Sequence, residues 1–347
     1  MLVADFDYQL PAELIAQAPP ESRDGGRLLV LGRESGSILH TSILSLPGLL
    51  RPGDLLVVND TKVFPARLLG RRVPSGGGVE CLLVARLDQD RWEALVHPGQ
   101  KLKPGARARF ERNDRALEAE ILERRFYGRR VVRLRASDGE DVDGAIDAIG
   151  HVPLPPYIKR DDRPEDMDRY QTVFARARGS IAAPTAGLHL SEGLLAALSA
   201  SGIQRTEITL HVGYGTFKPV RVERVEDHEV DAERFEIDDA AATSITRARD
   251  EGRRVIAVGT TTTRALESAA TATGRVEPSK SATGLFIYPG HRFRAVDGLL
   301  TNFHLPRSSL LMLVSALAGR ERVLAAYREA VQRRYHFYSY GDAMLIL

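Results

Sequence analysis

The sequence has almost no cysteine: Cys81 is the only one among 347 residues. A single cysteine excludes an intrachain disulfide, and no cysteine cluster is present that could hold zinc or an iron–sulfur group. The histidines also lack the i, i+4 spacing of a helical zinc site. We therefore expect a protein without a metal.

Long apolar runs are missing as well. No stretch reaches the roughly 18 apolar residues that a transmembrane helix needs. The first residues, "MLVADFDYQLP", carry acids early and lack the basic region and apolar core of a signal peptide. With 43% hydrophobic and 27% charged residues, the chain has the composition of a soluble globular protein. We expect it to be cytoplasmic, without membrane contact.

Three short motifs that would identify a reaction are also absent. The turn from Gly259 to Arg264 lacks the spacing of a Walker loop or a dinucleotide fingerprint. No Gly-x-Ser-x-Gly nucleophile elbow occurs. Short motifs alone therefore leave the reaction open.

The net charge is only +2, but the basic residues are unevenly distributed. Residues 101–135 contain twelve Lys or Arg and five acids. This segment is either a solvated sheet face or a surface that contacts nucleic-acid phosphates. The candidates for phosphate contact are Arg124, Arg125, Arg129 and Arg130, with Lys159 and Arg160 in the following loop.

The pattern of apolar residues and turn residues changes twice along the chain. Residues 26–31 and 54–58 are short apolar runs typical of buried strands. Residues 66–149 contain short alternating strands at close spacing, which is typical of a small antiparallel barrel. The sequence therefore predicts an α/β main domain, formed by residues 1–65 and 150–347, with an antiparallel β-barrel domain inserted at 66–149.

Residues beyond 180 alternate between strands and helices. The segment "LSEGLLAALSASG" predicts a helix with Ser191 as N-cap and Gly202 after its end. "GLFIYPG", residues 284–290, predicts a strand, and the C-terminal "YSYGDAMLIL" predicts a final buried strand.

Four turns share one arrangement, in which a strand ends and small, hydroxyl or histidine residues follow. They are Pro184–His189, His211–Phe217, Gly259–Arg264 and Thr301–His304. In open α/β sheets, ligands bind beyond the carboxyl ends of the strands. A lone histidine is more often structural than catalytic, so these turns indicate a crevice without naming its chemistry.

Ten sequence blocks, in order from Asp5 to the C-terminus, carry a family resemblance. They include "PGDLLVVNDTKVFPARLLGR", "GSIAAPTAGLHLSEGLL", "TLHVGYGTFKPVRVERVEDH", "VIAVGTTTTRALES" and "LLTNFHLPRSSLLMLVSALAG". On these blocks the chain resembles the S-adenosylmethionine:tRNA ribosyltransferase-isomerase family of queuosine biosynthesis. Asp231 and Gly284 depart from it, since a histidine and an aspartate are usual there.

The resemblance implies a reaction. The ribosyl part of S-adenosylmethionine is transferred and rearranged onto 7-aminomethyl-7-deazaguanine at the tRNA anticodon wobble position. Epoxyqueuosine-tRNA forms, and adenine and methionine are released. The partners implied are S-adenosylmethionine as co-substrate and the precursor-bearing tRNA, with no metal and no permanently bound cofactor. We expect a monomer.

The resemblance and the four turns together give the candidate site. Histidine suits the proton transfers of this reaction because its pKa lies near working pH. The candidates for catalysis are His189, His211, His304, Asp60 and Asp342. The candidates for holding S-adenosylmethionine and the nucleotide are Thr185, Gly187, Gly213, Gly215, Thr216, Thr260, Thr261, Arg264 and Asn302.

Two other functions stay open. A non-catalytic tRNA-binding protein would use the barrel as a platform, although it has no need of a small-molecule crevice. An S-adenosylmethionine-dependent RNA methyltransferase is disfavoured, because no glycine-rich loop after a first strand is followed by an acidic residue in the usual order.

Overall fold

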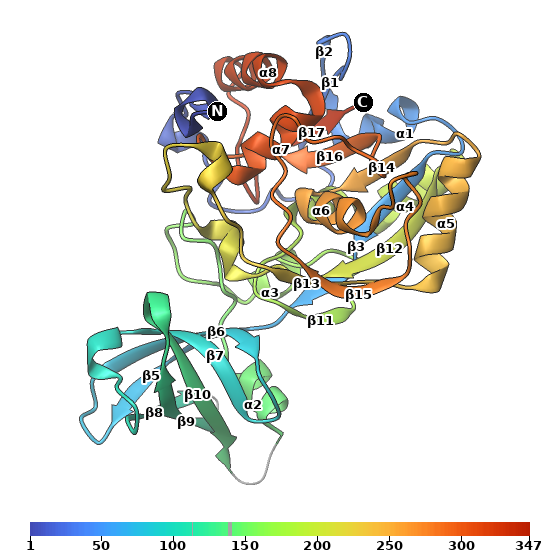
Figure 1. The fold of residues 1–347 in the computed structure, drawn as a ribbon. Helices are drawn as coiled ribbons and strands as arrows, with labels where there is room; N and C mark the ends of the chain where they lie inside the picture. The colour runs from blue at the N-terminus through green and yellow to red at the C-terminus, as the bar shows by residue number, and fades with distance from the viewer. Residues whose placement is uncertain (113, 138–140) are drawn as a thin grey trace.

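The structure is a computed structural model that describes residues 1–112, 114–137 and 141–347. Figure 1 shows a large lobe of sheet and helices, which contains both termini, and a barrel below it. The predicted fold class is confirmed: an α/β lobe is accompanied by an antiparallel β-barrel built from the middle of the chain. Four residues of the expected insertion, 113 and 138–140, lie outside the described residues.

The large lobe is built on a nine-stranded mixed sheet. Its four central strands, β12, β3, β14 and β16, run parallel, and antiparallel neighbours flank them on both sides. In spatial order the strands are β15 (Ser279–Thr283), β13 (Glu233–Ile237), β12 (Gln204–Leu210), β3 (Leu55–Asn59), β14 (Val255–Val258), β16 (Gly298–Asn302), β17 (Ala343–Ile346), β1 (Arg27–Leu31) and β2 (Ile38–Ser42).

Helices cover both faces of this sheet. Successive side chains of a strand point to opposite faces, so the apolar run of β3 supplies two cores. Leu55 and Val57 join the cluster under one set of helices, whereas Leu56 and Val58 join the other. The first face carries α5 (Asp239–Asp250), α6 (Thr260–Ala269), α7 (Ser309–Ala318) and α8 (Arg320–Gln332), and the second carries α1 (Leu46–Leu49) and α4 (Glu192–Ala200).

The barrel closes on itself through antiparallel pairs. Its spatial order is β10 (Arg129–Ala136), β7 (Arg91–His97), β6 (Gly78–Arg86), β5 (Arg67–Val73), β8 (Arg107–Arg112) and β9 (Arg115–Arg124), and β9 pairs with β10. Closure removes the unpaired edges that an open sheet would expose. Helix α2 (Val142–Ile149) packs on β8, β9 and β10 and buries Ala145, Ile146 and Ile149.

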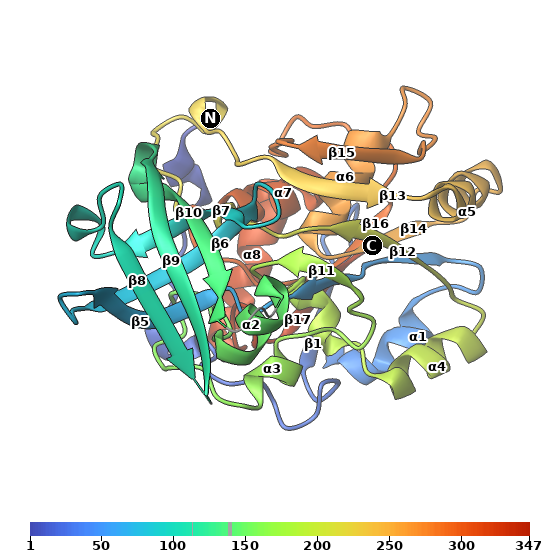
Figure 2. The same cartoon turned by 90° about the horizontal axis from the view of Figure 1, so that it is seen from below.

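A narrow neck joins the two lobes. The chain enters the barrel at Arg67 and leaves it at His151, and these two residues exchange backbone hydrogen bonds of 3.2 and 2.8 Å. Beside them, β4 (Thr61–Val63) pairs in parallel with β11 (Ala177–Ser180). Figure 2 shows β11 between the barrel and the large sheet. The neck therefore lies at the edge of the large sheet where β3 ends.

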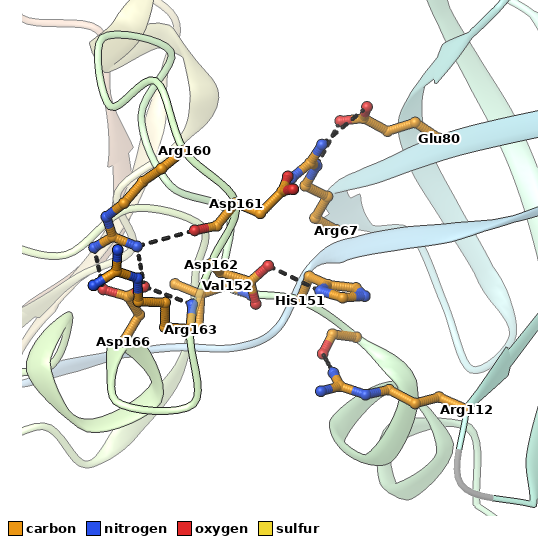
Figure 3. A network of polar contacts seen from close by, with 11 residues as sticks. Arg67, Glu80, Arg112, His151, Val152, Arg160, Asp161, Asp162, Arg163 and Asp166 are labelled. Carbon is orange, nitrogen blue, oxygen red and sulfur yellow. Dashed lines mark hydrogen bonds and ion pairs between the residues drawn. The ribbon is translucent and has the colours of Figure 1, made fainter. Parts of the chain in front are cut away.

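Ion pairs brace the neck, as Figure 3 shows. On the barrel side, Arg67 donates to Glu80 at 2.8 Å. His151 bonds to Asp162 at 2.9 Å, which ties the exit of the barrel to the loop that follows it. That loop contains one short helix, α3 (Asp166–Arg169).

Two local predictions have opposite outcomes. Ser191 is confirmed as the N-cap of α4, since its hydroxyl accepts from the backbone N–H of Leu194 at 3.0 Å. The strand predicted at 284–290 is wrong, because β15 ends at Thr283. The backbone there bonds to side chains instead of a neighbouring strand: Arg264 donates to the carbonyl of Leu285, and the Thr283 hydroxyl accepts from its N–H.

No helix in the described part of the chain is both long and apolar enough to cross a membrane.

Candidate functional site

The topology of the large sheet brings three of the four turns to one edge, and the fourth, Pro184–His189, follows β11 and packs against β16. The parallel strands β12, β3, β14 and β16 end at Leu210, Asn59, Val258 and Asn302, so their carboxyl ends lie side by side. Strand β17 is antiparallel to β16 and therefore begins at this edge, directly after Asp342. This is the edge at which α/β sheets bind ligands.

All four turns line one hollow at this edge. Its cavity volume is about 60 Å³, and it is partly open to solvent. Six of the predicted site residues line it: Thr185, Thr216, Thr260, Thr261, Asn302 and His304. The other predicted site residues do not line the hollow.

His304 is the histidine that lines the hollow. It is buried, and burial lowers its pKa to about 3. Its Nε2 bonds to Thr301 Oγ1 at 3.0 Å, while its backbone accepts from Tyr8 and donates to Tyr327. The ring is therefore neutral at neutral pH, and a neutral imidazole offers one hydrogen-bond donor and one acceptor.

His189 stands behind the wall of the hollow. Its Nε2 accepts from Asn302 Nδ2 at 3.1 Å, and Asn302 Oδ1 accepts from the Thr185 hydroxyl at 2.8 Å. Burial lowers the pKa of His189 to about 4, although the charge of Asp342 opposes this effect. A neutral His189 therefore fixes the orientation of the Asn302 amide, and the Thr185 oxygen is left to accept hydrogen bonds from the hollow.

His211, the third candidate histidine, does not line this hollow. Its Nδ1 bonds to Thr61 Oγ1 at 2.9 Å, and its ring lines a separate hollow between the lobes, with Trp92 and Arg178. Burial lowers its pKa, and Arg234 lowers it further. The structure therefore does not bring His211 together with His304.

Both predicted carboxylates are occupied by structural partners. Asp60 is buried, and it accepts from Arg176 at 2.8 Å and from the Thr209 hydroxyl at 2.6 Å. Asp342 accepts from the backbone and guanidinium of Arg27 and from the backbone of His336. Each carboxylate joins segments that are far apart in sequence, and neither lines the hollow.

Arg264 forms a buried ion pair with Glu233 at 2.6 Å. Burial raises the pKa of Glu233, while Arg264 favours its charged form. Glu233 Oε1 also accepts from the backbone of Gly213 at 2.8 Å and lies 3.5 Å from the Thr216 hydroxyl. This ion pair therefore supports the Thr216 wall of the hollow, and Arg264 already has a carboxylate partner from the chain itself.

Two predicted glycines are constrained by close packing. A Cβ on Gly187 would lie 2.8 Å from Thr172, and one on Gly215 would lie 3.0 Å from Asp231. Larger residues would displace the segments that border the hollow, so these glycines shape it without lining it.

Glu233 and three tyrosines at the hollow are not predicted from the sequence. Tyr157, Tyr170 and Tyr338 line the hollow, and the rings of Tyr157 and Tyr338 lie edge to face at 3.9 Å. Glu233 alternates with exposed positions along β13 as a buried residue would, which is a weak signal for an ion pair. The tyrosines come from loops without periodicity, so no local pattern indicated them.

The six predicted phosphate contacts differ in exposure. Arg124, Arg125 and Lys159 are exposed, and Arg129 is half-buried between Glu93 and Asp231. Arg125 also donates to carboxylates of the barrel, Glu93 and Glu123. Arg130 is buried and donates to the carbonyls of Leu102, Gly99 and Arg129, and Arg160 forms a double hydrogen bond with buried Asp166. The guanidinium groups of these two arginines therefore already have partners within the chain.

Among residues 1–112, 114–137 and 141–347, no three His, Cys, Asp or Glu side chains are grouped so that they could hold a metal ion.

Comparison with known proteins identifies the family. The family model described as "Queuosine biosynthesis protein" matches residues 3–346. The S-adenosylmethionine:tRNA ribosyltransferase-isomerases of Heliobacterium modesticaldum and Symbiobacterium thermophilum are 53% and 52% identical to the chain, with all of each chain covered. The crystal structure of S-adenosylmethionine tRNA ribosyltransferase from Thermotoga maritima is 38% identical, covers 99% of this chain and 100% of its own, and superposes with a TM-score of 0.55. The chain therefore belongs to the queuosine biosynthesis family of these ribosyltransferase-isomerases.

Proposed function

We propose that this protein transfers and isomerises the ribosyl moiety of S-adenosylmethionine onto 7-aminomethyl-7-deazaguanine at the wobble position of tRNA. The products are epoxyqueuosine-tRNA, adenine and methionine. The observation that carries the proposal is the full-length match, at about half identity, to relatives that bear this enzyme name. The hollow lined by all four turns lies at the edge of the sheet where ligands bind, and this is where we place the co-substrate.

The wall residues have chemistry suited to the two ends of S-adenosylmethionine. The first turn of α6, at Thr260 and Thr261, borders the hollow, and a helix N-terminus offers free N–H groups and a favourable field to the methionine carboxylate. We assign the carboxylate to this turn because Arg264 is already paired with Glu233. The Thr185 oxygen accepts a donor group such as a ribose hydroxyl.

Three proton movements accompany the proposed reaction. The sulfonium acidifies the adjacent ribose methylene, adenine leaves with a proton on nitrogen, and the attacking aminomethyl group loses one. His304 is the candidate for catalysis because, of the three predicted histidines, it is the one that lines the hollow. His189 is a positioning residue that acts through Asn302 and Thr185.

The proposal extends to the organisation of the molecule. Residues 66–149 form an inserted domain, and residues 1–65 and 150–347 form the catalytic domain. The protein works in the cytoplasm as a monomer on its two substrates, tRNA and S-adenosylmethionine. It needs no resident metal, because proton transfer and departure of a sulfonium leaving group require none.

One assay separates this function from its alternatives. Purified protein, S-adenosylmethionine and precursor-bearing tRNA are incubated, and the small products are resolved by chromatography. Free adenine is expected. S-adenosylhomocysteine in its place would indicate a methyltransferase, and tRNA binding without turnover of S-adenosylmethionine would indicate a non-catalytic RNA-binding protein.

A further inference from the structure

An aromatic side chain stands in solvent at the tip of the β9–β10 hairpin. The connection is a short 3-10 turn, Phe126–Gly128, and the Phe126 side chain is 87% exposed. Burial of a phenylalanine side chain stabilises a fold, and Phe126 does not contribute this stabilisation. Among the exposed large apolar residues of the described chain, the next is Leu44 at 58%.

The charges around the tip are mostly positive. Arg124 and Arg125 precede Phe126 and are exposed, while Arg129 follows it. Glu93 accepts from both Arg125 and Arg129, so it braces the two sides of the hairpin just below the tip. An exposed ring directly after two exposed arginines suits a partner that has flat apolar faces and negative charge.

Ion pairs and a packing contact connect the hairpin to the rim of the hollow. Arg129 donates to Asp231 at 3.0 Å, and Lys218 donates to the same carboxylate at 2.6 Å. Asp231 packs on Gly215, whose neighbour Thr216 lines the hollow. Figure 1 shows the hairpin end of the barrel rising toward the loop that contains these residues. A macromolecule held at the tip would therefore lie beside the hollow.

We propose that Phe126 is a stacking platform for an unpaired base of the RNA substrate, with Arg124 and Arg125 contacting the adjacent phosphates. This inference rests on the proposed function, because it concerns how the tRNA loop is presented to the hollow. Unpaired loop bases stack on aromatic side chains, and every base offers the same flat face. Double-stranded RNA has no such face to offer, so the site selects a loop.

The test measures equilibrium binding of an anticodon stem-loop RNA at several salt concentrations, without S-adenosylmethionine. Phe126→Ala is expected to weaken binding about 5- to 100-fold with the salt slope unchanged, because stacking releases few counterions. Phe126→Trp should bind within about 3-fold of the wild type. Arg124→Ala should reduce the salt slope by about one. Leu44→Ala, which removes an exposed apolar side chain from the other lobe, is the control and should match the wild type.

A turnover assay distinguishes failure of the stacking proposal from failure of the proposed function. If the wild type binds the stem-loop and releases adenine, but Phe126→Ala does both equally well, the stacking proposal is overturned and the proposed function stands. If the wild type neither binds the RNA nor releases adenine, the proposed function fails first. Equal weakening by Phe126→Ala and Phe126→Trp would also overturn stacking.

Discussion

At the scale of single residues, Glu233 and Arg264 bury opposite charges next to the hollow. Removing one partner of a buried ion pair leaves the other charge unpaired, which costs about 3–5 kcal/mol. Glu233→Ala should lower the free energy of unfolding by that amount in urea denaturation. The control is Glu236→Ala on the same strand, because Glu236 pairs with Lys280 at the surface and such pairs contribute about 1 kcal/mol or less. Equal losses in both variants would contradict the assigned role.

His189 provides a second prediction at this scale. A glutamine at this position keeps an oxygen that can accept from Asn302, whereas leucine cannot. His189→Gln should keep kcat and the KM for S-adenosylmethionine within about 10-fold. His189→Leu should raise this KM and lose about 100-fold in kcat/KM, because the Thr185 wall is misplaced. Equal losses in the two variants would instead make His189 a catalytic proton carrier.

The residue scale also marks the limit of sequence-based prediction. Asn302 ends β16 and His304 follows it, so the rule for the carboxyl ends of strands predicts both at the ligand-binding edge. The partners of Asp60 and Asp342 come from distant segments, so their ion pairs could not be predicted locally. His304 is buried whereas some other histidines are exposed, and this difference could not be predicted from the local sequence because burial depends on the whole fold.

At the scale of elements, α4 depends on its cap. Ser191 accepts from the backbone of Leu194 and donates to Asp24 at 2.5 Å, so it joins the helix start to the N-terminal segment. Ser191→Ala should lower the free energy of unfolding by about 1 kcal/mol. Ser201→Ala, at the exposed end of the same helix, is expected to change it by less than about 0.5 kcal/mol. The comparison is made by urea denaturation of both variants, and equal changes would refute the cap.

Elements with strong periodicity were predictable, and irregular ones were not. The apolar runs at β1 and β3 and the capped helix α4 agree with the sequence pattern. The segment 284–290 has the composition of a strand, yet Arg264 and Thr283 hold its backbone as a loop. Tertiary hydrogen bonds there override local propensity.

At the scale of the whole molecule, two buried neutral histidines make stability depend on pH. The pKa of His189 is about 4 and that of His304 about 3 in the folded protein, while both are near 6.5 when unfolded. Below about pH 6.5, these two histidines therefore bind protons in the unfolded chain but stay neutral in the folded chain. The stabilising contribution is complete above about pH 6.5 and falls as the pH drops toward 4.

Each histidine should contribute up to about 1.4 kcal/mol per pH unit to this loss. Urea denaturation at pH 7, 6 and 5 measures it. His304→Gln should show a shallower decrease than the wild type over this range, whatever its stability at pH 7. An identical slope in the two proteins would mean that His304 accepts a proton in the folded state.

The central claim is that the ribosyl group, and not the methyl group, of S-adenosylmethionine is transferred to tRNA. It is tested most directly with two labelled co-substrates, one labelled in the ribose carbons and one in the methyl group, followed by mass spectrometry of the digested tRNA. The account predicts that the ribose label enters the wobble nucleoside while the methyl label leaves with methionine. Methyl label in the tRNA, with the ribose label retained in S-adenosylhomocysteine, would contradict it.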